Sequence, residues 1–116
     1  MTERVPDCLF CKIVAGEVAS DRVYEDDEVI AFRDIAPQAP THVVVIPRRH
    51  IADAHSVTDG DDILGTLFAA TRAIAKDAGL ENGYRVITNV GREAGQSVFH
   101  LHLHLLGGRP MSWPPG

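Results

Sequence analysis

The chain has 116 residues, of which 45% are hydrophobic and 23% charged, and its formal net charge at pH 7 is −5. This length and composition predict one globular domain over residues 1–116 and exclude a disordered chain. The negative charge argues against a general nucleic-acid binder, and no apolar stretch approaches the roughly 18 residues of a membrane-spanning helix. The N-terminal sequence lacks the apolar segment of a secretory signal, so we expect a cytoplasmic protein without nucleic-acid or membrane partners.

The first expected element is a short helix from about Cys8 to Ala15, with Asp7 as its N-cap and Gly16 as its stop. Cys8 and Cys11 lie three residues apart, so both thiols project from one face of the first turn, where the helix dipole favours thiolate. A structural disulfide between them is not expected in a reducing compartment. Three interpretations of the pair stay open: metal ligands, a redox pair, or two small buried side chains.

Short strands follow, rich in β-branched residues and separated by turns and prolines. They are expected at Arg22–Tyr24, Val29–Phe32 and His42–Ile46. A long helix is expected to start near Thr58 or Asp59, with acidic residues in its first turn. Its apolar residues recur at helical spacing, namely Ile63, Leu67, Ala70, Ile74 and Ala78, and Gly79 supplies the stop.

Two more strands are expected at Tyr84–Asn89 and from about Phe99 to Leu106, and the tail 107–116 is too rich in Gly and Pro for regular structure. Strand hairpins with one long helix across a face predict an α+β domain. In the last strand, three histidines alternate with leucines from His100 to Leu106. Because strand side chains alternate between faces, the leucines should bury against the long helix and the imidazoles should line the opposite face.

This stripe of imidazoles has three interpretations: histidines placed by chance on a polar face, a metal-binding strand, or a catalytic group that works near neutral pH. The segment just upstream, Gly95-Gln96-Ser97-Val98, combines a flexible turn with amide and hydroxyl donors. A metal site would favour carboxylates or cysteines there, whereas a phosphate site needs donors. The local sequence therefore favours an oxyanion handled by histidine.

The run from His100 to Leu106 resembles the histidine-triad signature, His-x-His-x-His followed by two apolar residues. The resemblance covers nearly the whole chain and includes three further blocks: Asp34–His42, Ile46–His50, and Gly107–Arg109 with the ending Trp113–Gly116. The chain is similar to the Hint branch of that family, the nucleoside phosphoramidases. The resemblance implies an antiparallel sheet of about five strands, one long and one short helix, and a two-fold homodimer. In such a dimer the tail 107–116 lies near the interface, and Trp113 reaches the partner's site.

The same resemblance implies a reaction and a site. The reaction is cleavage of the bond between the α-phosphate of a purine nucleoside monophosphate (an AMP or GMP conjugate) and an amine, through a nucleotidyl-histidine intermediate. His102 matches the nucleophile, His104 a histidine that contacts the phosphate, and Ser97 the hydroxyl that reaches the leaving-group atom. His42 matches a histidine behind the triad, where a satisfied core histidine is an equally open interpretation. His55 matches nothing and is expected at the surface.

The nucleotide contacts implied by the resemblance come from three parts of the chain. Asp34 matches the carboxylate that accepts both ribose hydroxyls. Polar and backbone contacts around the phosphate fall on Asn89, Gly95, Gln96, Ser97 and Val98. The apolar slot for the base corresponds to Leu9, Phe10, Val18, Phe32 and Ile35, which the sequence alone would assign to ordinary core.

The resemblance also favours the metal interpretation of the cysteines. Many bacterial-type relatives complete a zinc site with two thiolates and two imidazoles, and the matching positions here are Cys8, Cys11, His50 and His100. Two thiolates and two imidazoles form a closed tetrahedral shell, so this zinc would be structural and would not activate water.

Two rival functions remain. A dinucleoside polyphosphate hydrolase of the Fhit type typically has Pro-Arg after the triad, whereas this chain has Leu106-Gly107-Gly108. A zinc-stapled nucleotide sensor or scaffold would use the same binding residues, and its activity would be incidental.

Overall fold

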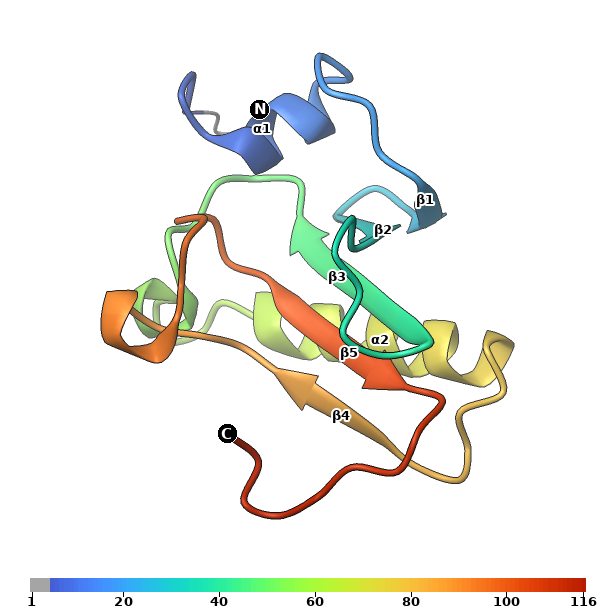
Figure 1. The fold of residues 1–116 in the computed structure, drawn as a ribbon. Coiled ribbons are helices and arrows are strands. Elements are labelled where there is room, and N and C mark those ends of the chain that lie inside the picture. Colours follow the sequence, from blue (N-terminus) through green and yellow to red (C-terminus); the bar gives the residue numbers. More distant parts are fainter. Residues whose placement is uncertain (1–4) are drawn as a thin grey trace.

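A computed structural model describes residues 5–116, so the first four residues of the N-terminal stretch lie outside the described part. Five antiparallel strands form one sheet in the order β1-β2-β3-β5-β4 (Figure 1). The strands are β1 (Arg22–Glu25), β2 (Val29–Arg33), β3 (Thr41–Pro47), β4 (Tyr84–Ile87) and β5 (Leu103–Gly107). The helices are α1 (Leu9–Val14) and α2 (Ile63–Asp77), with short 3₁₀ turns at Ala54–Ser56 and Arg92–Ala94. The predicted α+β class, with five antiparallel strands, one long helix and one short one, is confirmed.

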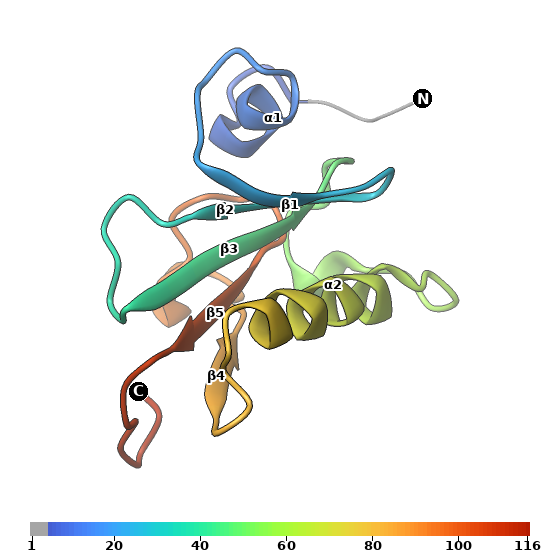
Figure 2. The ribbon, with the colours of Figure 1, turned by 90° about the vertical axis from the view of Figure 1, so that its right-hand side faces the viewer.

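The alternation of strand side chains divides the core into two layers on opposite faces of the sheet. One layer packs beneath α2 and includes Val43, Val45, Leu103 and Leu105. The other packs beneath α1 and includes Ile30, Phe32, Val44 and Ile46. Figure 2 shows the two helices on opposite sides of the sheet. Within residues 5–116, no helix combines the length and apolar character needed to cross a membrane.

The short helix begins one residue later than predicted, and its cap is different. Cys8 is the N-cap, and its Sγ accepts a hydrogen bond from the Cys11 backbone N–H at 3.3 Å. Asp7, the predicted cap, is exposed and lies one residue before Cys8. The thiol that caps the helix is therefore also a candidate metal ligand. The predicted stop at Gly16 is confirmed, because this residue has a φ of +78° that favours glycine.

The long helix begins at Ile63, four or five residues later than predicted, and no acidic residue lies in its first turn. Gly60 has a φ of +85°, which breaks a helix that would otherwise start at Thr58 or Asp59. Asp61 lies before the helix, where it accepts hydrogen bonds from the Ile63 N–H and from the Arg49 guanidinium.

The last strand begins at Leu103, so His100 and His102 lie before it in irregular chain that does not belong to the sheet. The Leu101 N–H donates to the Ile51 carbonyl, and the His102 carbonyl accepts from Thr88 Oγ1. These bonds occupy backbone groups that the sheet would have used. The alternation still continues through this segment, because Leu101 joins Leu103 and Leu105 in the α2 core, as predicted. The strand expected at Tyr84–Asn89 ends at Ile87.

Truncating the core leucine of α2 should destabilise the domain. Leu67 is fully buried against the sheet, so Leu67→Ala should lower the free energy of unfolding by about 2–5 kcal/mol, measured by urea denaturation. Lys76→Ala, an exposed change on the same helix, should cost less than about 0.5 kcal/mol. Equal losses in the two variants would contradict this account of the core.

Candidate functional site

The histidine face is assembled by the pairing of β3 with β5. In this antiparallel register His42 lies opposite Leu106, and His104 lies opposite Val44. His42 and His104 are therefore diagonal neighbours on one face of the sheet. His42 Nε2 lies 2.9 Å from His104 Nδ1, and the His104 ring centroid lies 5.0 Å from that of His102. Three imidazoles thus form one connected group.

Hydrogen bonds to the backbone define the protonation of His102. Its Nδ1 lies 2.7 Å from the His100 carbonyl oxygen, which can only accept, so Nδ1 carries the proton. Burial lowers the pKa of His102, which keeps the ring neutral near pH 7. Its Nε2 therefore carries a lone pair, as a nucleophile requires.

His104 has the opposite tautomer. The Gln38 backbone N–H donates to His42 Nδ1 at 3.0 Å, so the proton of a neutral His42 lies on Nε2. His42 Nε2 in turn donates to His104 Nδ1, which leaves His104 with its proton on Nε2. Burial, with the neighbouring His102 and His42 imidazoles, lowers the pKa of His104 to about 4. The face thus places a lone pair on His102 beside an N–H donor on His104.

Asp34 lies at the edge of this group. Its Oδ2 is 3.5 Å from His42 Nε2 and 4.0 Å from His104 Nδ1, a spacing that could also suit a metal ion. However, His42 Nε2 holds a proton because Nδ1 is occupied by Gln38, and a protonated nitrogen cannot be a ligand. We therefore interpret His42 and His104 as a hydrogen-bonded pair with the Asp34 carboxylate beside it. The other carboxylate oxygen, Oδ1, accepts the Ala36 N–H at 2.8 Å, which fixes the carboxylate orientation.

The four predicted metal ligands meet where α1 covers the sheet. Cys8 Sγ and Cys11 Sγ lie 3.4 and 3.6 Å from His100 Nδ1, and Cys11 Sγ lies 3.4 Å from His50 Nδ1. The bond lengths of a tetrahedral Zn²⁺ site require sulfur–nitrogen separations of about 3.5 Å. All four donor atoms lie within 4.8 Å of one another, so the residues fit a Zn²⁺ ion.

The two buried ligands His100 and Cys8 differ in how their protonation suits a bound cation. The His100 Nε2–H donates to the Pro47 carbonyl at 2.9 Å, and burial lowers the pKa of His100 to about 4, so its Nδ1 is free to coordinate. Burial raises the pKa of the Cys8 thiol, so the thiolate expected at this helix terminus is not favoured without a cation. A cation would reverse this shift, because metal ligation deprotonates a thiol.

The predicted phosphate loop is ordered by its own glutamine. The Gln96 side chain accepts the Gly91 N–H and donates to the carbonyls of Ala52 and Val98. Its amide is therefore engaged within the protein, and its contact with a nucleotide stays a prediction. Ser97 is exposed and Val98 half-buried, while Gly95 has a φ of +94° at the turn. Asn89 is half-buried just after β4.

The residues of the predicted base slot are divided between the α1 core and its rim. Phe10 and Phe32 are buried edge to face, with ring centroids 5.5 Å apart, and Val18 packs against their cluster. Leu9 is 45% exposed and Ile35 is fully exposed. The Phe10 ring also meets the His102 ring edge-on at 5.1 Å. The apolar cluster thus extends directly to the predicted nucleophile.

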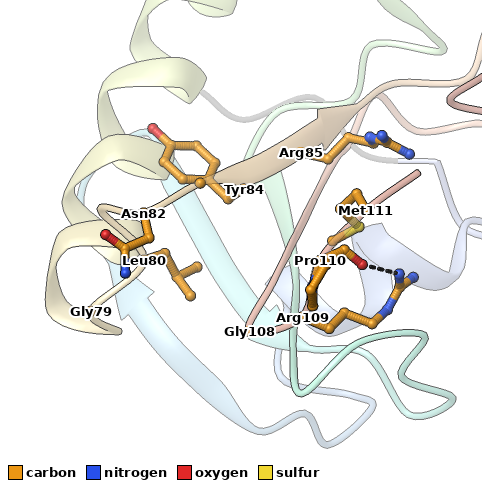
Figure 3. Close-up of a pocket in the computed structure, with 10 residues that line it drawn as sticks. Gly79, Leu80, Asn82, Tyr84, Arg85, Gly108, Arg109, Pro110 and Met111 are labelled. Atoms are coloured by element: carbon orange, nitrogen blue, oxygen red, sulfur yellow. Dashed lines mark hydrogen bonds between the residues drawn. The ribbon is translucent and has the colours of Figure 1, made fainter. Parts of the chain in front are cut away.

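A separate cavity of about 700 Å³ lies between the turn after α2 and the C-terminal tail (Figure 3). Arg85 and Arg109 line it, and both guanidinium groups donate to backbone carbonyls of the tail. It is lined by none of the predicted site residues and by no histidine, cysteine or carboxylate. We therefore place the chemistry on the histidine face and not in this cavity.

Trp113, in the same tail, is 84% exposed, and His55 is exposed as predicted.

Sequence reasoning missed the residues that set the imidazole tautomers and hold the chain around them. These contribute through backbone atoms (Gln38, Pro47 and Ile51) or through a hydroxyl outside any motif (Thr88). The only available signal was that Gln38 and Pro47 lie within the blocks that resemble the histidine-triad family. A backbone donor can come from any residue type, so no sequence pattern reveals it.

Similarity to known proteins identifies the family and supports the fold. The family model of the HIT domain matches residues 15–111. The crystal structure of a HIT family hydrolase from Legionella pneumophila has a TM-score of 0.92 at 51% identity, covering 95% of this chain and all of that one. An uncharacterized HIT-like protein of Synechococcus elongatus is 50% identical over 95% of this chain and 97% of its own. A 14 kDa zinc-binding protein of Zea mays is 50% identical over 93% of this chain and 87% of its own. The chain belongs to the HIT family.

Loss of one thiol should abolish stabilisation by zinc. Cys11→Ser should reduce bound zinc from one ion per chain to much less, measured by metal analysis after dialysis. Zinc at a hundred times its dissociation constant should stabilise the wild-type chain by about 2.7 kcal/mol. Thermal unfolding of the variant should be unaffected by zinc. An equal zinc response in both proteins would show that these residues are not the ligands.

The half-buried His104 should make stability fall in mild acid. Its pKa is about 4 when folded and about 6.5 when unfolded, so between these values the unfolded chain binds more protons. The free energy of unfolding should therefore decrease as the pH falls from 6.5 towards 4. His104→Gln, which keeps an acceptor for His42, should show a shallower decrease in urea denaturation across this range. Identical slopes would contradict the lowered pKa.

Proposed function

We propose that this HIT protein is a purine nucleoside phosphoramidase of the Hint branch, acting on conjugates of AMP or GMP with an amine. The observation that carries the proposal is the pair of opposite tautomers on one face. His102 offers an Nε2 lone pair, and His104 offers an Nε2–H beside it. Attack on a phosphoryl group needs a nucleophile and a donor for the phosphoryl oxygens, and these two imidazoles supply both.

The reaction has two steps. In the first, His102 Nε2 forms a bond to the α-phosphorus while the phosphorus–nitrogen bond of the substrate breaks, and the leaving amine takes up a proton. Ser97, which is exposed on the loop, is our candidate for contacting the leaving nitrogen. In the second step, water attacks the phosphorus, the bond to His102 breaks, and the nucleoside monophosphate is released. His104 holds the phosphoryl oxygens in both steps.

The nucleoside would lie along α1. The Asp34 carboxylate, oriented by the Ala36 N–H, is placed to accept two adjacent ribose hydroxyls. The base would lie against the apolar cluster of Phe10, Phe32 and Val18, with Leu9 and Ile35 at its rim. The phosphate would meet backbone N–H groups around Ser97 and Val98. This arrangement puts the α-phosphate beside His102, because Phe10 contacts both the apolar cluster and the nucleophile's ring.

Zinc would hold this site together without taking part in the reaction. Cys8, Cys11, His50 and His100 would fill all four coordination positions, which leaves none for substrate or water. The donor spacing supports this assignment, and the maize relative is named as a zinc-binding protein.

The tail and one edge of the sheet support a proposed two-fold dimer of single HIT domains over residues 1–116. β4 is an edge strand, and exposed apolar side chains lie near it at Tyr84, Val90 and Trp113. An edge strand offers unpaired backbone groups with which a second chain can pair. In the dimer, the tail 107–116 would lie near the interface and bring Trp113 to the partner's site.

Mass spectrometry during turnover tests the catalytic proposal. With adenosine phosphoramidate, quenched wild-type protein should carry one nucleotidyl group on His102. His102→Ala should lose the adduct and more than about 10³-fold in turnover, because the nucleophile has no substitute. His55→Ala, which removes an exposed histidine outside the site, is the matched control.

The alternatives give different results in the same assay. Nucleotide binding with no turnover by the wild-type chain would support a zinc-stapled sensor. Preferential cleavage of dinucleoside polyphosphates would support the Fhit type. Unchanged turnover in His102→Ala would overturn the proposed mechanism.

A further inference from the structure

We propose that the metal-ligand set has a second role: it positions the nucleophile by holding the peptide group between His100 and Leu101. This inference rests on the proposed function, because it concerns the orientation of His102 in that reaction. The peptide group is small and carries two hydrogen-bonding atoms. Its carbonyl oxygen is the acceptor that fixes His102 Nδ1–H at 2.7 Å.

One end of the peptide group is held by the side chain of His100. That imidazole is completely buried, and both of its nitrogens are engaged. Nε2–H donates to the Pro47 carbonyl at 2.9 Å, and Nδ1 faces the two thiols at 3.4 and 3.6 Å. The ring therefore has little freedom to rotate, and a bound cation would remove what remains.

The other end is held by the residue after a second metal ligand. The Leu101 N–H, which belongs to the same peptide group, donates to the Ile51 carbonyl at 2.6 Å. Ile51 directly follows His50, whose Nδ1 lies 3.4 Å from Cys11 Sγ. The segment from Pro47 to Ile51 thus touches His100 and Leu101 at two points. Two of the four metal ligands converge on the peptide group that orients His102.

The two metal ligands on α1 act on the His102 ring through Phe10. Phe10 lies between Cys8 and Cys11 in sequence, and its ring contacts those of His102 and His100 at centroid distances of 5.1 and 5.9 Å. Without a cation, the thiols can offer only weak hydrogen bonds to the imidazoles. The metal bonds would therefore fix the α1 turn, the His50 segment and the strand in one arrangement around His102.

If the metal ligands only stabilised the fold, removing one of them would unfold the strand that carries His102. We expect a different result. Leu101, Leu103 and Leu105 are already anchored in the α2 core on the opposite face, so the strand has support that does not depend on the metal ligands. Loosening the ligand set should consequently leave the fold in place and release only the orientation of the His100 carbonyl. His102 could then exchange its proton between Nδ1 and Nε2, and the fraction with a free Nε2 would fall. His100 is on this view a positioning residue.

The test reads the tautomer of His102 directly. Two-bond ¹H–¹⁵N spectra of the full chain are recorded with zinc bound, after chelation, and after zinc is restored. We expect a single Nδ1–H tautomer with zinc, mixed tautomers without it, and recovery on restoration. With adenosine phosphoramidate, kcat should fall severalfold without zinc, because fewer molecules carry a free His102 Nε2, while KM changes much less.

A matched pair of histidine variants separates positioning from folding. His50→Ala keeps three ligands and removes the one next to Ile51, whereas His55→Ala removes a nearby exposed histidine that is not a ligand. Zinc-loaded His50→Ala should show mixed His102 tautomers and reduced kcat, and His55→Ala should match the wild type. Core resonances such as those of Leu67 report folding in every sample. His50→Ala keeps both thiolates, and its spectra are recorded in excess zinc with the bound metal checked by metal analysis, so the test holds even if the zinc-free chain unfolds.

Two results would overturn the inference. One is a folded zinc-free chain that keeps a single Nδ1–H tautomer and full kcat. The other is zinc-loaded His50→Ala with an unchanged tautomer. Failure of the proposed function is distinguishable from both: the zinc-loaded wild type would then release no AMP, while the tautomer spectra would still decide whether the ligand set positions His102.

Discussion

The hydrogen bond from His102 Nδ1–H to the His100 carbonyl determines what the histidine face can do. An imidazole has two nitrogens and one proton when neutral, so fixing the proton on one side leaves a lone pair on the other. The neighbouring His104 is held in the opposite tautomer, with its proton on Nε2, by hydrogen bonds that run through His42 to the Gln38 N–H. Burial keeps both rings neutral, since it lowers both pKa values. The properties of the face therefore arise from backbone groups that orient side chains.

The two sides of the sheet are stabilised in different ways. The α2 side has a continuous apolar core under a helix of 15 residues. The α1 side has a helix of only six residues, too short to be stable alone, and a smaller cluster beneath it. The Cys8, Cys11, His50 and His100 set lies where this thinner layer would otherwise depend on few contacts. A metal ion there would add to the stability of this smaller core.

The sequence predicted the features that depend on the periodicity of side chains. It did not predict where an element begins when the conformation or hydrogen bonds of a single backbone position determine that boundary. Alternation from His100 to Leu106 predicted both the buried leucines and the shared face of the histidines, because strand side chains alternate strictly. It did not predict that β5 begins only at Leu103, because this depends on hydrogen bonds from the preceding backbone to Ile51 and Thr88. The start of α2 was misplaced because the φ of Gly60 cannot be read from the sequence. The contact between His42 and His104 follows from strand register, which no motif specifies.

The same alternation couples stability to chemistry within one segment of chain. Between residues 100 and 105, every odd position serves the α2 core. The even positions serve the other side of the sheet, His100 in the metal-ligand set and His102 and His104 on the histidine face. Inserting or deleting one residue here would exchange the two sets, placing imidazoles in the apolar core and leucines on the polar face. Such a change would remove folding and reactivity together. Evolution can therefore vary this segment by substitution within each set but not by a change in its length.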